Sequence, residues 1–476
     1  MTKKASKNGS NTVIKTHHNL IIRISALISV FLMTLPFGLV WLQTYAPHMF
    51  KPFYFKGNYY VILLFIPIFY LFGRLYDAFQ MAYHEQMDLF YGQILSAFLT
   101  DVFMFAVITF LYRKIPAIMP MFGVFGMQVI LSFIWTKISV RWYFAAHGKQ
   151  RALIIWGSKS GLKYTMDTRV MNKYFNIVDQ VNYDSVADRL DEVFAKKRVH
   201  TVFLLDMHSH QRNTILKYCF GHGIRALVIP SIGDLIMSSA TQIQMFNLPV
   251  LQIKEYYSKL EYVLIKRLVD IVLSALALIV LSPLLAVVAV IIKMTDGGTV
   301  FYRQVRLTKD RKEFEILKFR SMRMDAEKDG VARLSTGSND DRITPIGHFI
   351  RKYRIDELPQ LINILKGDMS IVGPRPERPE IASMYEKELP EFALRLRAKA
   401  GLTGFAQVYG KYNTSPYYKL LLDLMYIARP SLLMDLRIIF ATVKILFSAE
   451  ESTEGIKEGQ TTALLNLEEF RKGEEE

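Results

Sequence analysis

The chain has 476 residues, of which 51% are hydrophobic and 13% aromatic, a content that excludes an ordinary soluble enzyme and indicates several membrane helices. Its single cysteine, Cys219, excludes an intramolecular disulfide and a cysteine-rich metal site. A net charge of +16 without any nucleic-acid-binding motif favours a membrane protein near anionic head groups over a nucleic-acid-binding protein.

Four apolar stretches occupy the first third of the chain, at 19–43, 58–80, 93–112 and 118–139. Each is near the roughly 20 residues that a helix needs to cross a bilayer. No small-residue cleavage site follows the first, so we expect a retained helix rather than a signal peptide. Residues 1–145 are predicted to form four transmembrane helices with both flanks in the cytoplasm, because basic residues lie on both flanks: Lys3, Lys4, Lys7, Lys15 and Arg23 before, Arg141, Lys149 and Arg151 after.

Residues 146–250 alternate strand and helix patterns. A buried strand is predicted within 151–161 and further strands within 198–207 and 224–230, and this alternation indicates a small parallel sheet. Gly157 and Gly161 are present, but Lys159 stands where a dinucleotide-binding loop needs a glycine to approach a pyrophosphate. The sequence therefore favours a structural or regulatory Rossmann-like module over NAD binding and leaves another nucleotide open.

Residues 251–300 contain an apolar segment with no charged side chain between Asp270 and Lys293. The segment is long enough to cross a bilayer, but Pro283 kinks or breaks a helix, and Ser282 can bond the freed carbonyls. Basic residues lie at both ends, so a full span would violate the positive-inside rule at one of them. A re-entrant membrane helix with its break at Ser282-Pro283 is favoured, with a Pro-kinked span as the alternative.

The region 301–449 is polar and holds two adjacent carboxylates, Asp356 and Glu357. Pro359 is expected in the first turn of a helix that ends at Gly367. Acidic residues near a helix start are common for dipole reasons alone. The basic residues of this region favour polyphosphate binding, since arginine binds phosphate oxygens bidentately. Mg²⁺ held by the two carboxylates could bridge a diphosphate. These basic residues are Lys318, Arg320, Arg351 and Arg375.

These residues fall in motifs that resemble the bacterial sugar transferases, monotopic phosphoglycosyl transferases that prime capsule, exopolysaccharide or O-antigen synthesis. The resemblance covers roughly 255–449, and the two preceding regions resemble those of the larger family members. Thr308 and Arg311 stand where the family usually has glycines, which puts the shape of that loop in doubt. The motifs are Lys266-Arg267 with Asp270, Ser282-Pro283, "KFRSM" (318–322), "DELPQL" (356–361), "GDMSIVGPRP" (367–376) and "GLTGFAQVYGK" (401–411).

The resemblance implies transfer of a sugar 1-phosphate from a UDP-sugar to undecaprenyl phosphate, with release of UMP. Asp356 would be the nucleophile that forms a covalent phosphosugar aspartate, and Glu357 would help to hold Mg²⁺ or manage protons. Glucose or galactose is expected, because large members with four spans often take hexoses. The other implied roles are phosphate or lipid head-group binding by Lys266, Arg267, Lys318, Arg320 and Arg351, and nucleotide-sugar binding by Arg375, Gln407 and Lys411.

Two other functions stay open at this point. A direct glycosyltransferase would pass on the sugar alone and release UDP, whereas a non-catalytic membrane scaffold or length regulator would show no turnover. The nucleotide that is released separates these alternatives.

The predicted fold class is a membrane α-helical bundle, a cytoplasmic α/β Rossmann-like module and an α/β catalytic domain with a re-entrant membrane helix. We expect a multi-pass protein of the bacterial inner (plasma) membrane with its catalytic domain in the cytoplasm. A homodimer through the spans or the Rossmann-like module is a further expectation, and nucleic acid is not an expected partner. Residues 450–476 form a predicted acidic tail with nine glutamates.

Overall fold

The computed structural model describes residues 2–53, 56–81, 84–157, 168–205, 207–253, 259–323, 342–410 and 415–447. Two compact units, Met1–Ile229 and Pro230–Glu476, divide the chain. The predicted acidic tail lies outside the described residues, as do Lys159, Gly161 and Lys411.

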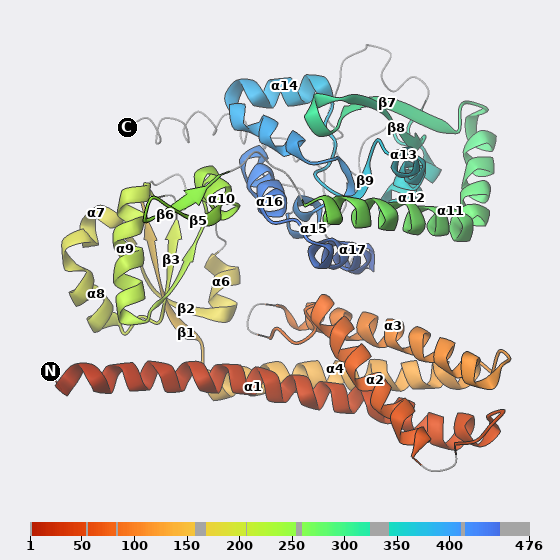
Figure 1. Cartoon of the computed structure of the whole chain (residues 1–476), viewed down its shortest axis with the longest axis horizontal. Helices are drawn as coiled ribbons and strands as arrows, with labels where there is room; N and C mark the ends of the chain where they lie inside the picture. Colours follow the sequence, from red (N-terminus) through yellow and green to blue (C-terminus); the bar gives the residue numbers. More distant parts are fainter. Residues whose placement is uncertain are drawn as a thin grey trace. The chain divides into compact units, whose positions relative to one another are not determined.

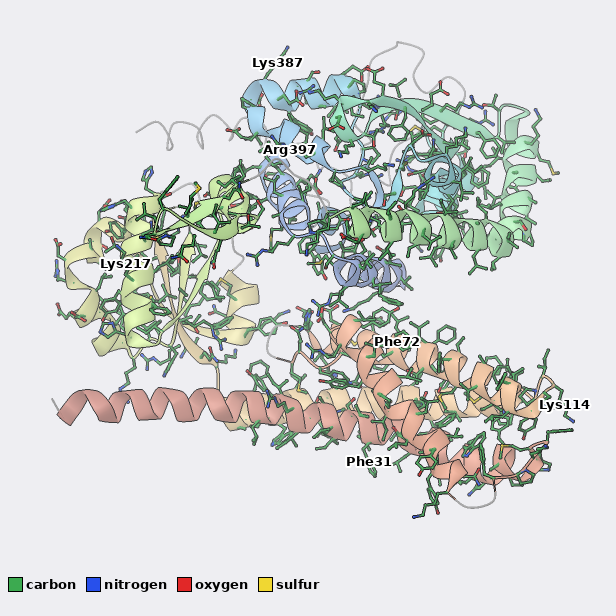
Figure 2. The ribbon with its side chains drawn as sticks, viewed as in Figure 1. Phe31, Phe72, Lys114, Lys217, Lys387 and Arg397 are labelled. Carbon is green, nitrogen blue, oxygen red and sulfur yellow. The ribbon has the colours of Figure 1, made fainter. Side chains whose placement is uncertain are left out.

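The first unit begins with four long helices, and each predicted apolar stretch lies mainly within one of them. Large apolar side chains such as Phe37, Trp41 and Phe65 fill the interior between the helices. Other apolar side chains face outward, as Phe31 does in Figure 2. An apolar exterior suits lipid rather than water. The helices are α1 (Thr2–Val40), α2 (Gly57–Leu75), α3 (Gln86–Tyr112) and α4 (Met119–His147), shown in Figure 1.

The rest of this unit is a four-stranded sheet in the order β2-β1-β3-β4, with every pair parallel. The predicted parallel sheet is confirmed, but β2 was missed. It lies at the sheet edge, where polar residues such as Asp179 and Gln180 interrupt the apolar pattern. The elements are β1 (Gln150–Trp156), α6 (Thr168–Tyr174), β2 (Phe175–Asn182), α7 (Tyr183–Val186), α8 (Leu190–Lys197), β3 (Thr201–Leu205), α9 (Ser209–His222) and β4 (Arg225–Val228).

The second unit opens with a short helix and a hairpin: α10 (Ile232–Ser238), β5 (Thr241–Met245) and β6 (Leu248–Gln252). Phe246 and Asn247 both adopt positive φ at the turn, as the two central residues of a type I′ hairpin do. Arg429 donates a hydrogen bond to the carbonyl of Ser238 at 3.0 Å, which joins α10 to the later part of this unit. The domain boundaries given above stay predictions.

The helix α11 (Leu260–Asp296) is continuous over 37 residues and contains Pro283. A straight helix of that length would measure about 55 Å, well beyond a hydrocarbon core of about 30 Å. Figure 1 instead shows α11 changing direction before it reaches β7. Both arms pack on the same α/β fold, since Leu278 joins the hydrophobic cluster of Ile364 and Val288 joins that of Ile350. Re-entry into a membrane stays a prediction.

With α11 included, five helices of the described residues are long and apolar enough to cross a membrane. The α/β fold that follows α11 contains two small sheets. The strands β7 (Phe301–Leu307) and β8 (Glu313–Phe319) pair antiparallel, and β9 (Ser370–Val372) pairs parallel with β10 (Gly401–Thr403). The helices are α12 (Pro345–Lys352), α13 (Gln360–Lys366), α14 (Pro379–Glu388), α15 (Phe405–Tyr409), α16 (Pro416–Ala428) and α17 (Leu432–Phe447), with 3-10 turns η5 (Ile355–Glu357) and η6 (Pro390–Arg397).

Two glycines let the "GPRP" and "GLTG" loops run backbone against backbone. A Cβ added at Gly373 would meet the carbonyl oxygen of Lys399 at 2.2 Å, and one added at Gly401 would meet the amide nitrogen of Gly373 at 2.1 Å. The carbonyl of Pro374 also accepts a hydrogen bond from the Gly401 amide at 2.9 Å. Any larger residue at either glycine would push apart the loop that holds Arg375.

Candidate active site

The adjacent carboxylates lie in the short turn η5 between α12 and α13. Arg354 enters this turn with a left-handed backbone (φ 54°), and its carbonyl accepts a hydrogen bond from the Glu357 amide at 3.2 Å. Pro359 precedes α13 as its N-cap residue, so the expectation that it lies in the first helical turn was wrong, and the carboxylates form a separate turn. Gly367 ends α13 in the left-handed conformation, as predicted.

Glu357 is held by two cations from elsewhere in the sequence. Its Oε1 accepts hydrogen bonds from Lys318 Nζ at 3.0 Å and Arg375 Nη2 at 2.7 Å, and its side chain is only 10% exposed. Burial alone raises the pKa of Glu357, but Arg375 and Lys318 outweigh burial and hold the pKa well below its usual range. Glu357 in turn raises the pKa of the Arg375 guanidinium. This carboxylate is therefore ionised and fixed in place.

Asp356 is in the opposite situation, although it is the next residue. Within the described residues, no hydrogen bond or ion pair to its carboxylate is found. Burial, followed by the charge of Glu357, raises the pKa of Asp356 to about 6, while Lys318, Arg351 and Arg375 oppose the rise. Two neighbouring carboxylates with pKa values pushed apart are typical of sites in which the two groups have different chemical roles.

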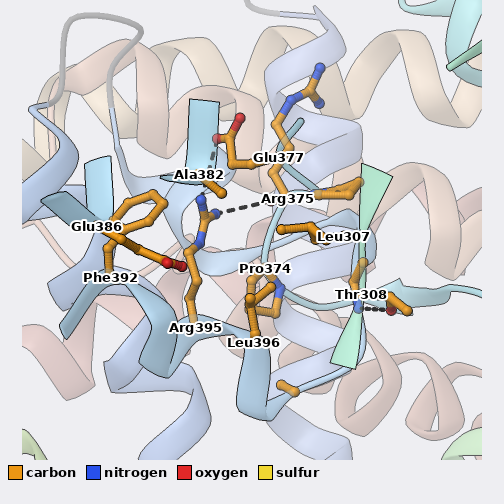
Figure 3. Close-up of a pocket in the computed structure, with 13 residues that line it drawn as sticks. Leu307, Thr308, Pro374, Arg375, Glu377, Ala382, Glu386, Phe392, Arg395 and Leu396 are labelled. Atoms are coloured by element: carbon orange, nitrogen blue, oxygen red, sulfur yellow. Dashed lines mark hydrogen bonds and ion pairs between the residues drawn. The ribbon is translucent and has the colours of Figure 1, made fainter. Parts of the chain in front are cut away.

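Arg375 owes its position to two further arginines that the sequence analysis missed. Arg395 donates to the carbonyl of Arg375 at 3.0 Å and forms an ion pair with Glu377 at 3.3 Å, as Figure 3 shows. Arg306 donates to the carbonyl of Pro376 at 3.1 Å from the other side. No local motif distinguishes these arginines, because they act on backbone carbonyls that only folding brings near them.

The pocket in Figure 3 lies behind this loop, between the end of β7, α14 and η6. Pro374, Arg375 and Arg395 line it, whereas Lys318 and Asp356 do not. We therefore treat the pocket as support for the Arg375 loop and place the candidate reaction centre at η5.

Two predicted residues on α11 connect it to the α/β fold. Arg267 donates to the carbonyls of Ile364 at 2.6 Å and Leu365 at 2.8 Å, in the last turn of α13. Asp270 accepts a hydrogen bond from the amide of Ile371 at 3.0 Å. These contacts fix α11 against α13 and β9, and a role of Arg267 in head-group binding stays a prediction.

Three further predicted residues make contacts outside the ion pairs of Glu357. Lys266 forms an ion pair with Asp435 at 3.0 Å and does not join the η5 cluster. Gln407 donates to the carbonyl of Leu402 at 3.4 Å within its own segment. Arg320 is buried, with its guanidinium so close to the preceding loop that a Cβ at Gly298 would overlap it.

The carboxylates of η5 also fit the metal that the sequence suggested. No group of three or more His, Cys, Asp or Glu side chains suited to a metal occurs among the described residues. Mg²⁺ needs few protein ligands, because it keeps several waters and takes oxygens from substrate phosphates. Glu357 uses only Oε1 for its two ion pairs, so Asp356 and Glu357 could together hold a metal ion shared with a diphosphate.

Comparison with known proteins identifies relatives over this same region. A UDP-N-acetylgalactosamine-undecaprenyl-phosphate N-acetylgalactosaminephosphotransferase of Aeromonas hydrophila is 39% identical over 190 residues, 39% of this chain and 44% of the relative. A UDP-glucose:undecaprenyl-phosphate glucose-1-phosphate transferase of Xanthomonas campestris pv. campestris is 35% identical over 270 residues, 54% of this chain and 55% of the relative. The chain thus spans about half the length of these two relatives.

A third relative is covered almost completely. The exopolysaccharide production protein PSS of Rhizobium leguminosarum bv. phaseoli is 42% identical over 188 residues, which are 38% of this chain and 93% of the relative. A family model described as bacterial sugar transferase matches residues 261–449, which include every contact of the site described above. The chain belongs to the bacterial sugar transferase family.

Proposed function

We propose that this protein transfers a sugar 1-phosphate from a UDP-sugar to undecaprenyl phosphate and releases UMP. The observation that carries the proposal is the contrast between two adjacent carboxylates. Lys318 and Arg375 bind Glu357, whereas Asp356 is free of ion pairs among the described residues and has a pKa raised to about 6. A carboxylate that is not engaged by cationic side chains keeps an oxygen available for attack, whereas two cationic side chains already occupy Glu357.

In the first step an oxygen of the Asp356 carboxylate attacks the β-phosphorus of the UDP-sugar. The bond from this phosphorus to the oxygen that bridges the two phosphates breaks, and UMP leaves with that oxygen. The product is a phosphosugar joined to Asp356 as an acyl phosphate. Arg375 and Lys318, which bind the adjacent Glu357, would stabilise the charge that develops on the phosphate oxygens.

In the second step a phosphate oxygen of undecaprenyl phosphate attacks the same phosphorus. The acyl phosphate bond breaks, the carboxylate of Asp356 is regenerated, and the lipid carries a diphosphate-linked sugar. Asp356 and Glu357 would hold Mg²⁺, which when bound would offset negative charge on the diphosphate and on UMP.

The names of the first two relatives both contain undecaprenyl phosphate, which supports it as the acceptor proposed here. They differ in the sugar, which is N-acetylgalactosamine in one name and glucose in the other. For this chain we propose glucose or galactose and a role in priming capsule or exopolysaccharide synthesis. We also place the chain in the bacterial inner membrane with Asp356 on the cytoplasmic side, where UDP-sugars are dissolved.

The experiment uses the full-length protein in lipid nanodiscs with a panel of UDP-sugars, undecaprenyl phosphate and Mg²⁺. We expect UMP to be released with one hexose donor, and UDP-sugar alone to leave a phosphosugar adduct on the Asp356 peptide. Asp356→Asn should lower turnover by several orders of magnitude, as loss of a nucleophile does. Glu380→Gln, at an exposed acid of α14, is the matched control. Release of UDP, or absence of turnover, would overturn the proposal.

A further inference from the structure

The interior of the N-terminal helical bundle holds a carboxyl group that the proposed chemistry does not use. Asp101 lies 15 residues after Gln86 and 11 before Tyr112, the first and last residues of α3, so it is near the middle of a helix of membrane-spanning length. The residue is only 6% exposed. An ionised carboxylate is costly in such surroundings, and ionisable residues inside membrane segments are commonly functional.

The hydrogen bonds around Asp101 leave two acceptors without a donor. Gln128 Nε2 donates to the carbonyl oxygen of Met33 at 3.0 Å and to Asp101 Oδ1 at 3.4 Å. A backbone carbonyl cannot donate, so the contact with Met33 fixes which end of the Gln128 side chain carries the hydrogens. Within the described residues, Asp101 Oδ2 and Gln128 Oε1 are buried and have no hydrogen-bond partner. The two groups are thus in contact, and one shared hydrogen would satisfy an acceptor on each.

Other polar side chains of the bundle interior differ from this pair. The hydroxyls of Ser96, Thr100 and Thr136 each donate to a carbonyl one turn earlier in their own helix, as small polar residues packed between membrane helices commonly do. In the part of the chain that the structure describes, Asp101 forms no ion pair, and every charged side chain of the surrounding helices is exposed. These are Arg23 of α1, Arg74 of α2, and Lys137 and Arg141 of α4.

We propose that Asp101 and Gln128 form an intramembrane proton-binding site. One proton bound to Asp101 Oδ2 neutralises the carboxylate and turns Oδ2 into a donor for Gln128 Oε1, while Oδ1 continues to accept from Nε2. The carboxylic acid and the carboxamide then pair through two hydrogen bonds, and the carbonyl of Met33 holds the amide from α1. Because Gln128 belongs to α4, the proton connects α1, α3 and α4. This site does not depend on the function proposed for η5.

Infrared spectroscopy of the full-length protein in lipid nanodiscs tests the protonation directly. The C=O stretch of a protonated carboxylic acid is separate from the bands of ionised carboxylates and shifts in D2O. Exposed carboxyl groups are ionised at pH 8. The native spectrum minus that of Asp101→Asn should therefore contain this band. Asp88→Asn is the matched control, since Asp88 lies partly exposed in the first turn of α3 and its removal should take away no such band. Absence of the band from the Asp101 difference spectrum would overturn the proposal.

A second measurement tests the connection between the helices. Asp101→Asn keeps an amide that can make both hydrogen bonds without a proton, whereas Asp101→Leu can make neither and should lower the unfolding midpoint. Unfolding that brings Asp101 into water releases its proton, so the unfolded chain binds fewer protons and the native bundle loses stability as the pH rises. Between pH 6 and 8 the unfolding equilibrium constant of the native chain should rise about tenfold per pH unit relative to that of Asp101→Asn.

The same measurement distinguishes a proton from a metal cation. Asp101 Oδ2 and Gln128 Oε1 are oxygen ligands that Na⁺ could also use, so the unfolding experiment is repeated with choline chloride in place of NaCl. We expect the unfolding midpoint to be the same in both salts. An equal pH dependence in the native chain and Asp101→Asn would overturn the proton site, and so would a native stability that depends on Na⁺ and is independent of it in Asp101→Asn.

Discussion

The hydroxyl of Ser282 donates a hydrogen bond to the carbonyl oxygen of Ile279 at 2.8 Å. Pro283 has no amide hydrogen, and the carbonyl that it leaves without its helical donor is the one four residues earlier, which is Ile279. The serine hydroxyl thus binds the acceptor that the proline frees. In apolar surroundings without water, this bond makes a helix bend tolerable.

The first prediction is that both ends of α11 face the same side of the membrane. Single cysteines at Leu264 and Met294, both exposed, in a Cys219→Ser chain should react with a membrane-impermeant maleimide from the cytoplasmic side only. Replacing Pro283 by Leu favours a straight helix, because proline costs about 3 kcal/mol in a helix interior. We expect this change to expose one end to the outside in part of the molecules and to lower activity. Labelling of the two ends of the native helix from opposite sides would contradict re-entry.

The second prediction concerns the pH dependence of adduct formation. The nucleophile must be ionised, and burial raises the pKa of Asp356 to about 6. The rate should therefore be constant above about pH 7 and fall as the pH is lowered through 6, whereas an unperturbed aspartate with a pKa of about 3.9 would keep its rate at pH 5. Glu357 should not contribute, because Arg375 and Lys318 hold its pKa well below this range. Quenched single-turnover reactions between pH 5 and 8, analysed by intact mass, measure this, and a flat profile would contradict it.

The sequence predicted those features that depend on local pattern. Continuous apolar runs predicted the helices α1 to α4 and the strands β1, β3 and β4, because such runs favour lipid or a protein core over water. The edge strand β2 was not predicted, because none of its residues is fully buried and its polar residues interrupt the apolar sequence pattern. Motifs also located Lys318, Arg375 and Glu357, which folding brings together.

Long-range support of the site was not predictable from the sequence. Arg395 and Arg306 bind carbonyls of the Arg375 loop, and nothing in the sequence distinguishes them from the many other arginines of this basic chain.

The contacts of Arg267 were not predicted either, although its motif was noticed. Its motif suggested a phosphate contact, but the structure gives it two carbonyl partners at the end of α13, because backbone acceptors at a helix end carry no signature in the sequence.

The third prediction is that transfer requires a divalent cation that does not stabilise the fold. EDTA should abolish UMP release, and Mg²⁺ or Mn²⁺ should restore it, because the proposed ligands are Asp356, Glu357 and substrate phosphates, all hard oxygen donors. The midpoint of thermal unfolding should stay unchanged in EDTA, since the proposed site has only two protein carboxylates and the described residues contain no group of three or more metal-ligating side chains. Full turnover in the presence of chelator would contradict the metal proposal and leave the nucleophile unaffected.

The fourth prediction concerns Arg395, whose side chain is 4% exposed and pairs with Asp423 at 2.8 Å as well as with Glu377. Arg395→Met leaves Asp423 buried without its cation, so we expect a loss of about 3–5 kcal/mol, as for one broken half of a buried pair. The fall should appear as a lower thermal unfolding midpoint in detergent. Arg397→Met is the matched control, because Arg397 is exposed and should change stability by only about 0.5 kcal/mol.

A double variant separates charge burial from support of the loop. Asp423→Asn added to Arg395→Met removes the unpaired charge and should recover part of the unfolding midpoint, which a double-mutant cycle quantifies. It should not recover the KM for UDP-sugar, because the carbonyl of Arg375 still lacks its donor. Arg395→Lys keeps the charge but cannot reproduce the planar fork that reaches two acids and a carbonyl, so it should also raise this KM. A native KM in Arg395→Lys and in the double variant would show that Arg395 supports only the fold and not the position of Arg375.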